Sequence, residues 1–276
     1  MSRLLRTRKG AFGFGVLLIL VLVALFAPLL APYSPNEIHL QDQLVGPSGQ
    51  YLFGTDEVGR DVLSRVIYAA RPAIGAGLVT VALAALVGAL TGLVAGYQAG
   101  AFDALVMRLW DTLLAFPAIF LAIGIVSVLG PGWINAVLAI AILNMPAFSR
   151  LVRASTLSIR NREFVTAAHA VGCSDWRIMV QHVFPNCVGP LVVQMAIAVP
   201  EAILIEATLS FLGLGSQPPE PSWGNMLGGA QTYLYRSAWY ALFPGLAITL
   251  AVVGTNFFAD GLQDALDPRR VRLRTG

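Results

Sequence analysis

Two carboxylates, Glu201 and Glu206, stand within a stretch of apolar residues long enough to cross a membrane, residues 188–211. An ionisable side chain at membrane depth is costly, so by default it marks a path for substrate or protons. The alternative is that both side chains border a hydrated cavity of the protein and are merely solvated there. Asp111, in another apolar stretch, is more simply interpreted as a local ion pair with Arg108, three residues before it. These acids are compatible with proton-coupled transport, and they indicate no particular substrate.

The sequence lacks the residues that ATP hydrolysis, nucleophilic catalysis or metal binding would require at the relevant positions. Lys9 is the only lysine, so there is no glycine-rich phosphate loop, which ends in Gly-Lys-Ser/Thr. The three histidines lie outside the apolar stretches, which removes a membrane-embedded Ser–His pair and a histidine metal site. Cys173 and Cys187 are both expected on the cytoplasmic side, where thiols stay reduced. We therefore expect no catalytic residues, no metal site and no cofactor bound by this chain.

The composition is that of a membrane protein. Hydrophobic residues make up 57% of the 276 residues and charged residues 12%, whereas soluble domains carry about 25% charged residues. A helix needs about 20 apolar residues to cross the hydrocarbon core. Windows of that length predict an all-α polytopic membrane protein with six transmembrane helices, at residues 11–31, 73–97, 104–129, 133–149, 188–211 and 239–260. The first window is longer than a signal-peptide core of about 7–15 residues, so we expect it to be retained.

The positive charges orient the chain in the membrane. If the N-terminus is cytoplasmic, six spans return the C-terminus to the same side. The outer side then holds only four of the 18 Lys and Arg residues, namely Arg60, Arg65, Arg71 and Arg236. This is a strong positive-inside bias, and it predicts that both termini are cytoplasmic. Because topology also accounts for the net charge of +3, no nucleic-acid partner is expected.

Residues 161–185 form a polar cytoplasmic segment with two amphipathic periods. Apolar residues recur at i, i+3, i+4 and i+7 on each side of Gly172, the spacing that builds one stripe on a helix. The glycine sits where a left-handed turn would end the first helix, and Pro185 is expected to stop the second. We interpret this segment as a docking surface, because it is too polar for lipid and too regular for an idle loop. Its stripes are Phe164, Ala167, Ala168 and Val171, then Trp176, Met179, Val180 and Val183.

Two further patterns concern packing. Within a long outer loop, residues 32–72, the pattern at 59–71 predicts a helix lying at the membrane interface. In the second span, Gly88, Gly92 and Gly96 recur at every fourth residue. A ridge of small residues lets another helix approach closely, so helix packing is the expected role. The alternative is that the ridge lines a pathway.

Five residues of segment 161–185 carry a family resemblance. Thr166-Ala167-Ala168, Gly172 and Pro185 resemble the signature of ABC-importer permeases, which begins with Glu-Ala-Ala. The resemblance implies that the segment holds coupling helices, which insert into a cleft of a partner ATPase. Thr166 stands where the family usually has glutamate, so the resemblance implies no carboxylate contact from that position.

The outer loop extends the resemblance. Gly54-Thr55-Asp56 and Gly59-Arg60-Asp61 resemble the outer-loop motif of the second permease of dipeptide and oligopeptide importers. Residues 210–224 and 264–269 resemble the fifth outer segment and the C-terminal ending of these permeases. The resemblance implies the type I ABC importer permease fold. Residues 1–72 would form the cytoplasmic tail, first span and outer loop, and residues 73–276 the core of five spans.

The resemblance also implies an activity and its partners. The chain is expected to be a permease subunit of an ATP-driven importer of di- or oligopeptides, in the lipid bilayer of the bacterial inner membrane. Its partners would be a second homologous permease, one or two kinds of ATP-binding subunit that carry ATP and Mg²⁺, and an extracytoplasmic peptide-binding protein. Glutathione and nickel chelates are alternative cargoes. The rival class is a proton-coupled secondary transporter that uses Glu201, Glu206 or Asp111, although no inverted repeat is visible in the sequence.

Overall fold

The computed structural model describes residues 7–266, and in that range it is built from helices without a named β-strand. Residues 267–269 of the C-terminal motif lie outside the described range. The helices are α1 (Arg8–Leu25), α2 (Ala27–Leu30), α3 (Val62–Gln98), α4 (Gly100–Leu114), α5 (Ala118–Leu129), α6 (Trp133–Ile159), α7 (Glu163–Ala170), α8 (Asp175–Ile178), α9 (Phe184–Phe211), α10 (Trp223–Ala230) and α11 (Ala238–Leu266). A π-helical turn (Met179–Val183) joins α8 to α9.

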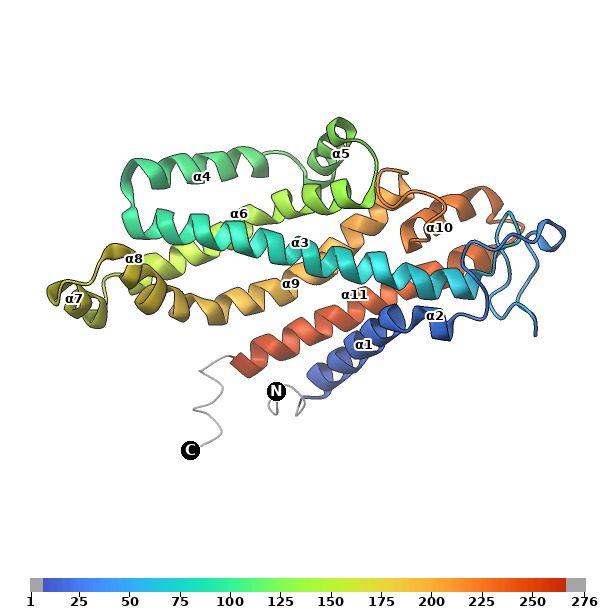
Figure 1. Ribbon diagram of the computed structural model, residues 1–276, viewed down its shortest axis with the longest axis horizontal. Helices are drawn as coiled ribbons and strands as arrows, with labels where there is room; N and C mark the ends of the chain where they lie inside the picture. The colour runs from blue at the N-terminus through green and yellow to red at the C-terminus, as the bar shows by residue number, and fades with distance from the viewer. Residues whose placement is uncertain (1–6, 267–276) are drawn as a thin grey trace.

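The long helices α3, α6, α9 and α11 run along the long axis of the molecule, and α1 lies beside α11 (Figure 1). Helices α7 and α8 lie at one end of this bundle. Helix α10 and the loop between α2 and α3 lie at the other end (Figure 1). Segment 161–185 and the outer-loop motif are therefore separated by the length of the bundle, as expected if they face opposite sides of a membrane.

The hydropathy windows predicted the positions of the spans, but they did not predict that the third is bent. Within residues 7–266, five helical stretches are long and apolar enough to cross a membrane, namely α1, α3, α6, the run from α8 through α9, and α11. The window 104–129 is not a straight span, because α4 and α5 meet at an angle of 95°. Counted as one span, this bent pair makes six. Pro117 explains the break, since it has no backbone N–H and disfavours helical geometry at Phe116.

Helix α3 begins earlier than predicted and absorbs the expected interfacial helix. It is 37 residues long, which corresponds to about 55 Å, well beyond the roughly 30 Å of the hydrocarbon core. The prediction of a separate interfacial helix at residues 59–71 is therefore wrong, because its residues from Val62 onward belong to α3. Pro72 lies inside the helix without ending it. The proposed boundary between residues 72 and 73 falls within this one helix.

The glycine ridge packs α3 against α6, as predicted. A Cβ atom at Gly88 would lie 2.6 Å from the Phe148 Cβ, and one at Gly96 would lie 2.8 Å from the Arg153 carbonyl oxygen. At Gly92 it would overlap the Ser149 carbonyl oxygen. The two backbones approach so closely that no side chain fits between them. This contact forms part of the main hydrophobic core, to which α3, α5, α6 and α9 contribute buried residues.

The helix that follows Gly172 does not stop at Pro185. Helix α8, the π-helical turn and α9 form one helical run of 37 residues, Asp175–Phe211. Pro185 lies in the first turn of α9, directly after the π-helical turn, where the backbone hydrogen-bond ladder changes register and a residue without an N–H is tolerated. The prediction that Pro185 ends the second amphipathic helix is therefore wrong. As a result, the segment after Gly172 is directly continuous with a membrane-spanning helix.

Candidate functional site

The turn at Gly172 has the predicted geometry. Its φ of +81° lies in the left-handed region, and its N–H donates to the His169 carbonyl oxygen at 2.9 Å. The next N–H, of Cys173, reaches back to the Ala168 carbonyl oxygen at 3.1 Å. Apart from its two chain neighbours, no described residue has an atom within 4 Å of a Cβ built on Gly172. The requirement for glycine is therefore one of backbone conformation and not of space.

The two predicted stripes are divided between the core and the surface. Met179 and Val183 are buried against the hydrophobic core, so the prediction that they belong to an exposed docking face is wrong. Their neighbours Val165, Ala168 and Ile178 also pack inward. Four large apolar side chains of segment 161–185 remain exposed. They are Phe164, Val171, Trp176 and Val180, with exposed fractions of 41%, 79%, 63% and 40%, and we refer to them below as the apolar patch.

The remaining predicted residues of this segment border the patch. Thr166, Ala167 and Pro185 are exposed. Thr166 directs its hydroxyl toward the Arg162 carbonyl oxygen of its own helix, at 3.5 Å. Ala168 alone of the Thr-Ala-Ala motif is buried. This distribution is that of a helix seated on the bundle by one face, with the other face available to a partner.

A polar cluster that sequence reasoning missed fastens the segment to α3. The Tyr97 hydroxyl donates to Asp175 Oδ1 at 2.9 Å and lies 3.1 Å from His169 Nε2. Arg160, at the end of α6, donates to the carbonyl oxygens of Gly96 and Tyr97, each at 3.1 Å. The last turn of α3 is thereby joined to α6, α7 and α8. No spacing in the sequence relates Tyr97 to residues more than 70 positions away.

Ion pairs fix α4 to α6 near the same end of the bundle. Arg153 Nη2 donates to Asp103 Oδ2 at 2.6 Å. Asp111 pairs with Arg150 of α6, so the interpretation of Asp111 and Arg108 as a local pair is wrong. Trp110 adds a hydrogen bond from its indole N–H to Ser149 Oγ at 2.9 Å. Residues three apart on one helix are neighbours, but here the fold brings an arginine of another helix, α6, to the carboxylate.

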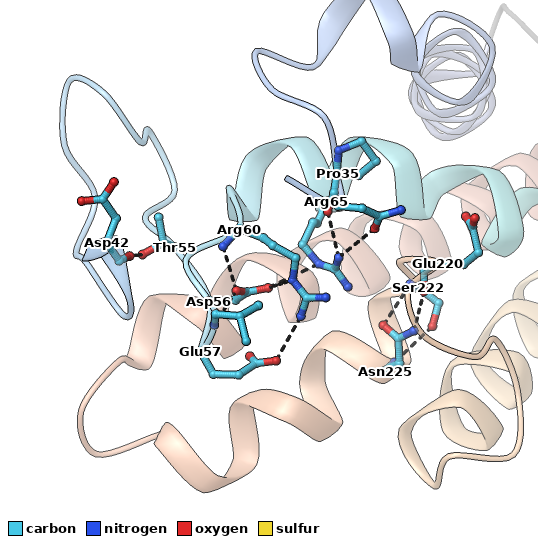
Figure 2. Close-up of polar contacts among 12 residues, drawn as sticks. Pro35, Asp42, Thr55, Asp56, Glu57, Arg60, Arg65, Glu220, Ser222 and Asn225 are labelled. Carbon is cyan, nitrogen blue, oxygen red and sulfur yellow. Dashed lines mark hydrogen bonds and ion pairs between the residues drawn. The ribbon is translucent and has the colours of Figure 1, made fainter. Parts of the chain in front are cut away.

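At the opposite end, the outer-loop motif folds around Asp56. This carboxylate is fully buried and accepts hydrogen bonds from the backbone N–H groups of Val58 and Arg60 at 3.0 and 2.9 Å. Arg60 Nε lies 2.6 Å and Arg65 Nε 3.6 Å from Asp56 Oδ2 (Figure 2). Arg60 also pairs with Glu57 at 3.0 Å. Two arginines thus converge on one buried acid, which holds the loop against the start of α3.

The other motif residues have equally defined structural roles. Asp61 caps α3, accepting from the Ser64 N–H at 2.7 Å. The Thr55 hydroxyl accepts from the Val45 N–H at 2.8 Å and donates to the Asp42 carbonyl oxygen (Figure 2). Gly54 and Gly59 have φ of +75° and +81°, and a Cβ on Gly59 would overlap the His39 carbonyl oxygen. The motif therefore builds the outer loop itself.

A second hydrogen bond to Asp42 strengthens the same loop. The Tyr51 hydroxyl donates to Asp42 Oδ2 at 2.9 Å. Burial and this hydrogen bond raise the pKa of Tyr51 to about 12. The phenol therefore stays protonated at every pH at which a cell lives, and the bond persists.

Replacing Asp56 with alanine is expected to destabilise the protein by about 3 kcal/mol, because it leaves Arg65 buried without its counter-charge. The matched control is Glu37→Ala, which removes an exposed carboxylate of the same loop and should change stability by less than about 0.5 kcal/mol. Thermal unfolding of the purified chain in detergent measures the difference. Equal melting temperatures for both variants would contradict a structural role for Asp56.

The two carboxylates of α9 differ in their surroundings. Glu206 is 1% exposed and accepts hydrogen bonds from Ser210 Oγ at 2.7 Å and Ser216 Oγ at 3.3 Å. The backbone N–H of Ser216 in turn donates to Ser210 Oγ at 3.0 Å. Glu206 thus holds the turn after α9 against the helix, and the view that it borders a hydrated cavity is wrong within this chain. Glu201 is exposed on the surface of α9.

Comparison with known proteins identifies the class. The family described as the binding-protein-dependent transport system inner membrane component matches residues 88–272, and the N-terminal TM domain of oligopeptide transport permease C matches residues 1–47. The chain belongs to the first of these families, and it is a multi-pass protein of the bacterial inner membrane.

Individual relatives are similar over nearly the whole chain. The di/tripeptide transport system permease protein DppC of Pseudomonas aeruginosa is 47% identical over 95% of this chain and 88% of its own length. The dipeptide transport system permease protein DppC of Alkalihalophilus pseudofirmus is 43% identical over 97% of this chain and 88% of its own length. The glutathione transport system permease protein GsiD of Pectobacterium atrosepticum is 40% identical over 97% and 89%.

Proposed function

We propose that this chain is one of two transmembrane subunits of an ATP-driven importer of di- or oligopeptides. Relatives of nearly the same length belong to dipeptide and di/tripeptide transport systems. The second subunit would be a homologous permease, and an extracytoplasmic binding protein would deliver the peptide to the outer face. The chain itself contributes no ATP site, because its only lysine, Lys9, is not part of a phosphate loop.

The observation that carries the proposal is the apolar patch. Its four exposed apolar side chains lie between the start of α7 and the π-helical turn after α8, and α7 and α8 lie at the end of the bundle (Figure 1). Exposed apolar patches on folded proteins mark interaction sites. Here the partner would be one or two kinds of ATP-binding subunit, which carry ATP and Mg²⁺.

Energy transfer then requires a stiff connection from the patch to the membrane helices. ATP can bias the permease only if the ATPase contact differs in free energy between the inward-open and outward-open states. The half of the patch after Gly172, with Trp176 and Val180, is connected to α9 without a break. The segment is also connected to α3 through Tyr97, Asp175 and His169. A displacement of the patch by closing ATPases would therefore move two spans together.

The acids of α9 fit this proposal better than proton-coupled transport. Glu206 is buried and hydrogen-bonded by two serines, so it resembles a structural group more than an accessible proton site. Glu201 is the exposed carboxylate, and we assign it as the candidate residue of the translocation path.

Reconstitution tests the proposal. The isolated chain in nanodiscs should hydrolyse no ATP, whereas the complex with its partner permease and ATPases should do so and be stimulated further by the binding protein. Proteoliposomes holding the complex should accumulate a tritiated dipeptide only with ATP on the ATPase side. ATP hydrolysis by the isolated chain, or uptake driven by a pH gradient alone, would contradict the proposal. Uptake of glutathione in place of dipeptides would contradict the cargo and leave the ATP-driven mechanism standing.

A further inference from the structure

A pocket of about 580 Å³ opens at the outer end of the bundle. It lies between the first turns of α3, the Gly-Pro-Gly turn before α6, and the segment that joins α9 to α10. Its volume falls within the range of about 300–1,000 Å³ that is typical of small-molecule sites. The lining residues are Pro35, Asn36, Tyr68, Arg71, Pro72, Gly132, Trp133, Ser216, Gln217, Glu220 and Pro221.

Most polar side chains of this lining already have partners inside the protein. Trp133 donates its indole N–H to the Pro72 carbonyl oxygen at 3.0 Å. Gln217 donates to the carbonyl oxygens of Gly213 and Gly215, each at 2.9 Å. Ser216 bonds Glu206 through its hydroxyl. These groups shape the pocket and leave little hydrogen-bonding capacity for a ligand.

Two charged side chains are the exceptions. Arg71 donates its Nε to the Ala24 carbonyl oxygen at 2.8 Å, and its Cζ lies 5.1 Å from the Tyr68 ring centroid. These contacts orient the guanidinium, and within residues 7–266 no carboxylate pairs with it. Glu220 is held through its backbone, which contacts Gln217 and Asn225. In Figure 2 no dashed line reaches the Glu220 carboxylate.

We propose that this outer pocket is a binding site for the free ends of a short peptide, the C-terminal carboxylate at Arg71 and the N-terminal ammonium at Glu220. The inference rests on the proposed function. A guanidinium binds a carboxylate in a bidentate manner, with strong charge-assisted hydrogen bonds. A site with one free cation and one free anion matches a ligand that carries both charges. Tyr68, Trp133 and the prolines offer apolar surface to the peptide's side chains.

Recognition through the two ends suits an importer of varied peptides. All unblocked peptides share the terminal charges, whereas their side chains differ. A receiving site on the permease that holds only the ends would accept many sequences. It would also keep a peptide at the outer face between its release from the binding protein and its movement through the membrane.

The experiment pairs each charged residue with the peptide end that it is proposed to bind. The full complex, without binding protein, is placed in nanodiscs and equilibrated with tritiated Ala-Phe, its C-terminal amide or its N-acetyl form. Wild type should bind each blocked peptide about tenfold or more weakly than Ala-Phe, because one charge-assisted contact is lost. Arg71→Gln should bind Ala-Phe and its amide equally, and Glu220→Gln should bind Ala-Phe and its N-acetyl form equally. Arg71→Lys should retain discrimination against the amide.

Arg236→Gln is the matched control, since it removes an exposed outer arginine that does not line the pocket, and it should behave like wild type. Full discrimination in Arg71→Gln and Glu220→Gln would overturn the inference, as would a wild-type complex that imports dipeptides but binds none in this assay. The binding defects of Arg71→Gln and Glu220→Gln could also appear only in nanodiscs that contain phosphatidylethanolamine. That result would overturn the inference and make a zwitterionic lipid headgroup the ligand of the pocket. Failure of ATP-driven dipeptide uptake by wild type with its binding protein would instead contradict the proposed function.

Discussion

Trp176→Asp should abolish ATP-driven uptake while leaving the chain folded in the membrane. The indole is 63% exposed within this chain, so the change removes no core contact. At the proposed ATPase interface it would replace an aromatic anchor, which typically contributes about 2 kcal/mol or more, by a carboxylate that is buried without a partner. A loss of 2 kcal/mol corresponds to roughly 30-fold weaker binding. Co-purification of the ATPases with the tagged permease measures the effect, followed by uptake in proteoliposomes.

Trp176→Phe is the matched control, because it keeps an aromatic side chain at the same position, and it should retain assembly and most of the uptake. Gly172→Val should reproduce the defect by a different route, since a β-branched residue is strongly disfavoured at positive φ. That change would re-aim Phe164 and Val171 relative to Trp176. If Trp176→Asp and Gly172→Val both assemble and transport like wild type, the apolar patch is not the coupling surface.

Features that depend on local chemistry were predictable from the sequence. The turn at Gly172 follows from a glycine at the end of an amphipathic period, and the structure has φ of +81° there. The contact between α3 and α6 follows from glycines at every fourth residue, which need only a neighbouring helix to become an interface. The apolar windows locate the spanning helices because hydropathy measures what lipid requires.

Features that depend on the relation between elements were not predictable. The hydropathy of a window does not show whether the helix axis changes direction within it. Residues 104–129 were therefore predicted to be one span, although α4 and α5 meet at 95°. A helical period shows that one face of a helix is apolar, but it does not show whether the protein core or a partner covers that face. Met179 and Val183 therefore looked like docking residues, whereas the core of the bundle covers them. Pro185 does not end the helical run, because it directly follows the π-helical turn at the start of α9, and the sequence alone does not indicate that turn.

The same distinction applies to the charged residues. Asp111 was paired with the nearest arginine in sequence, but α6 brings Arg150 to it. The motif around Asp56 was recognised in the sequence as a family pattern. Its structural role follows only from the fold, in which Arg60 and Arg65 both contact the Asp56 carboxylate. Arg71 and Glu220 are about 150 positions apart, and only the fold places them at one pocket.

Gly92→Ala should be among the most disruptive single-methyl changes in the chain. The added Cβ would overlap the Ser149 carbonyl oxygen of α6, and this neighbour is backbone that cannot rotate away. Overpacking of a well-packed core costs about 1–3 kcal/mol and occasionally more. The extra methyl acts against this by improving helix propensity by about 1 kcal/mol. Because the blocking neighbour is backbone, we take the upper end of that range and expect a net destabilisation of about 2 kcal/mol, that is, about 3 less about 1 kcal/mol. Thermal unfolding of the detergent-purified chain measures it, and Gly92→Val should fail to fold.

Gly15→Ala is the matched control for this prediction. It adds the same methyl group to a membrane-spanning helix, α1, but no atom lies within 4 Å of the new Cβ. Only the gain in helix propensity then remains, so Gly15→Ala should be as stable as wild type or slightly more stable. Both variants add one methyl group to a glycine of a membrane-spanning helix. Comparing Gly92→Ala with Gly15→Ala therefore separates the effect of helix packing from that of helix propensity. If Gly92→Ala unfolds at the same temperature as Gly15→Ala, α3 and α6 are free to separate by the width of a methyl group. The glycine ridge would then not be the contact that holds the bundle together.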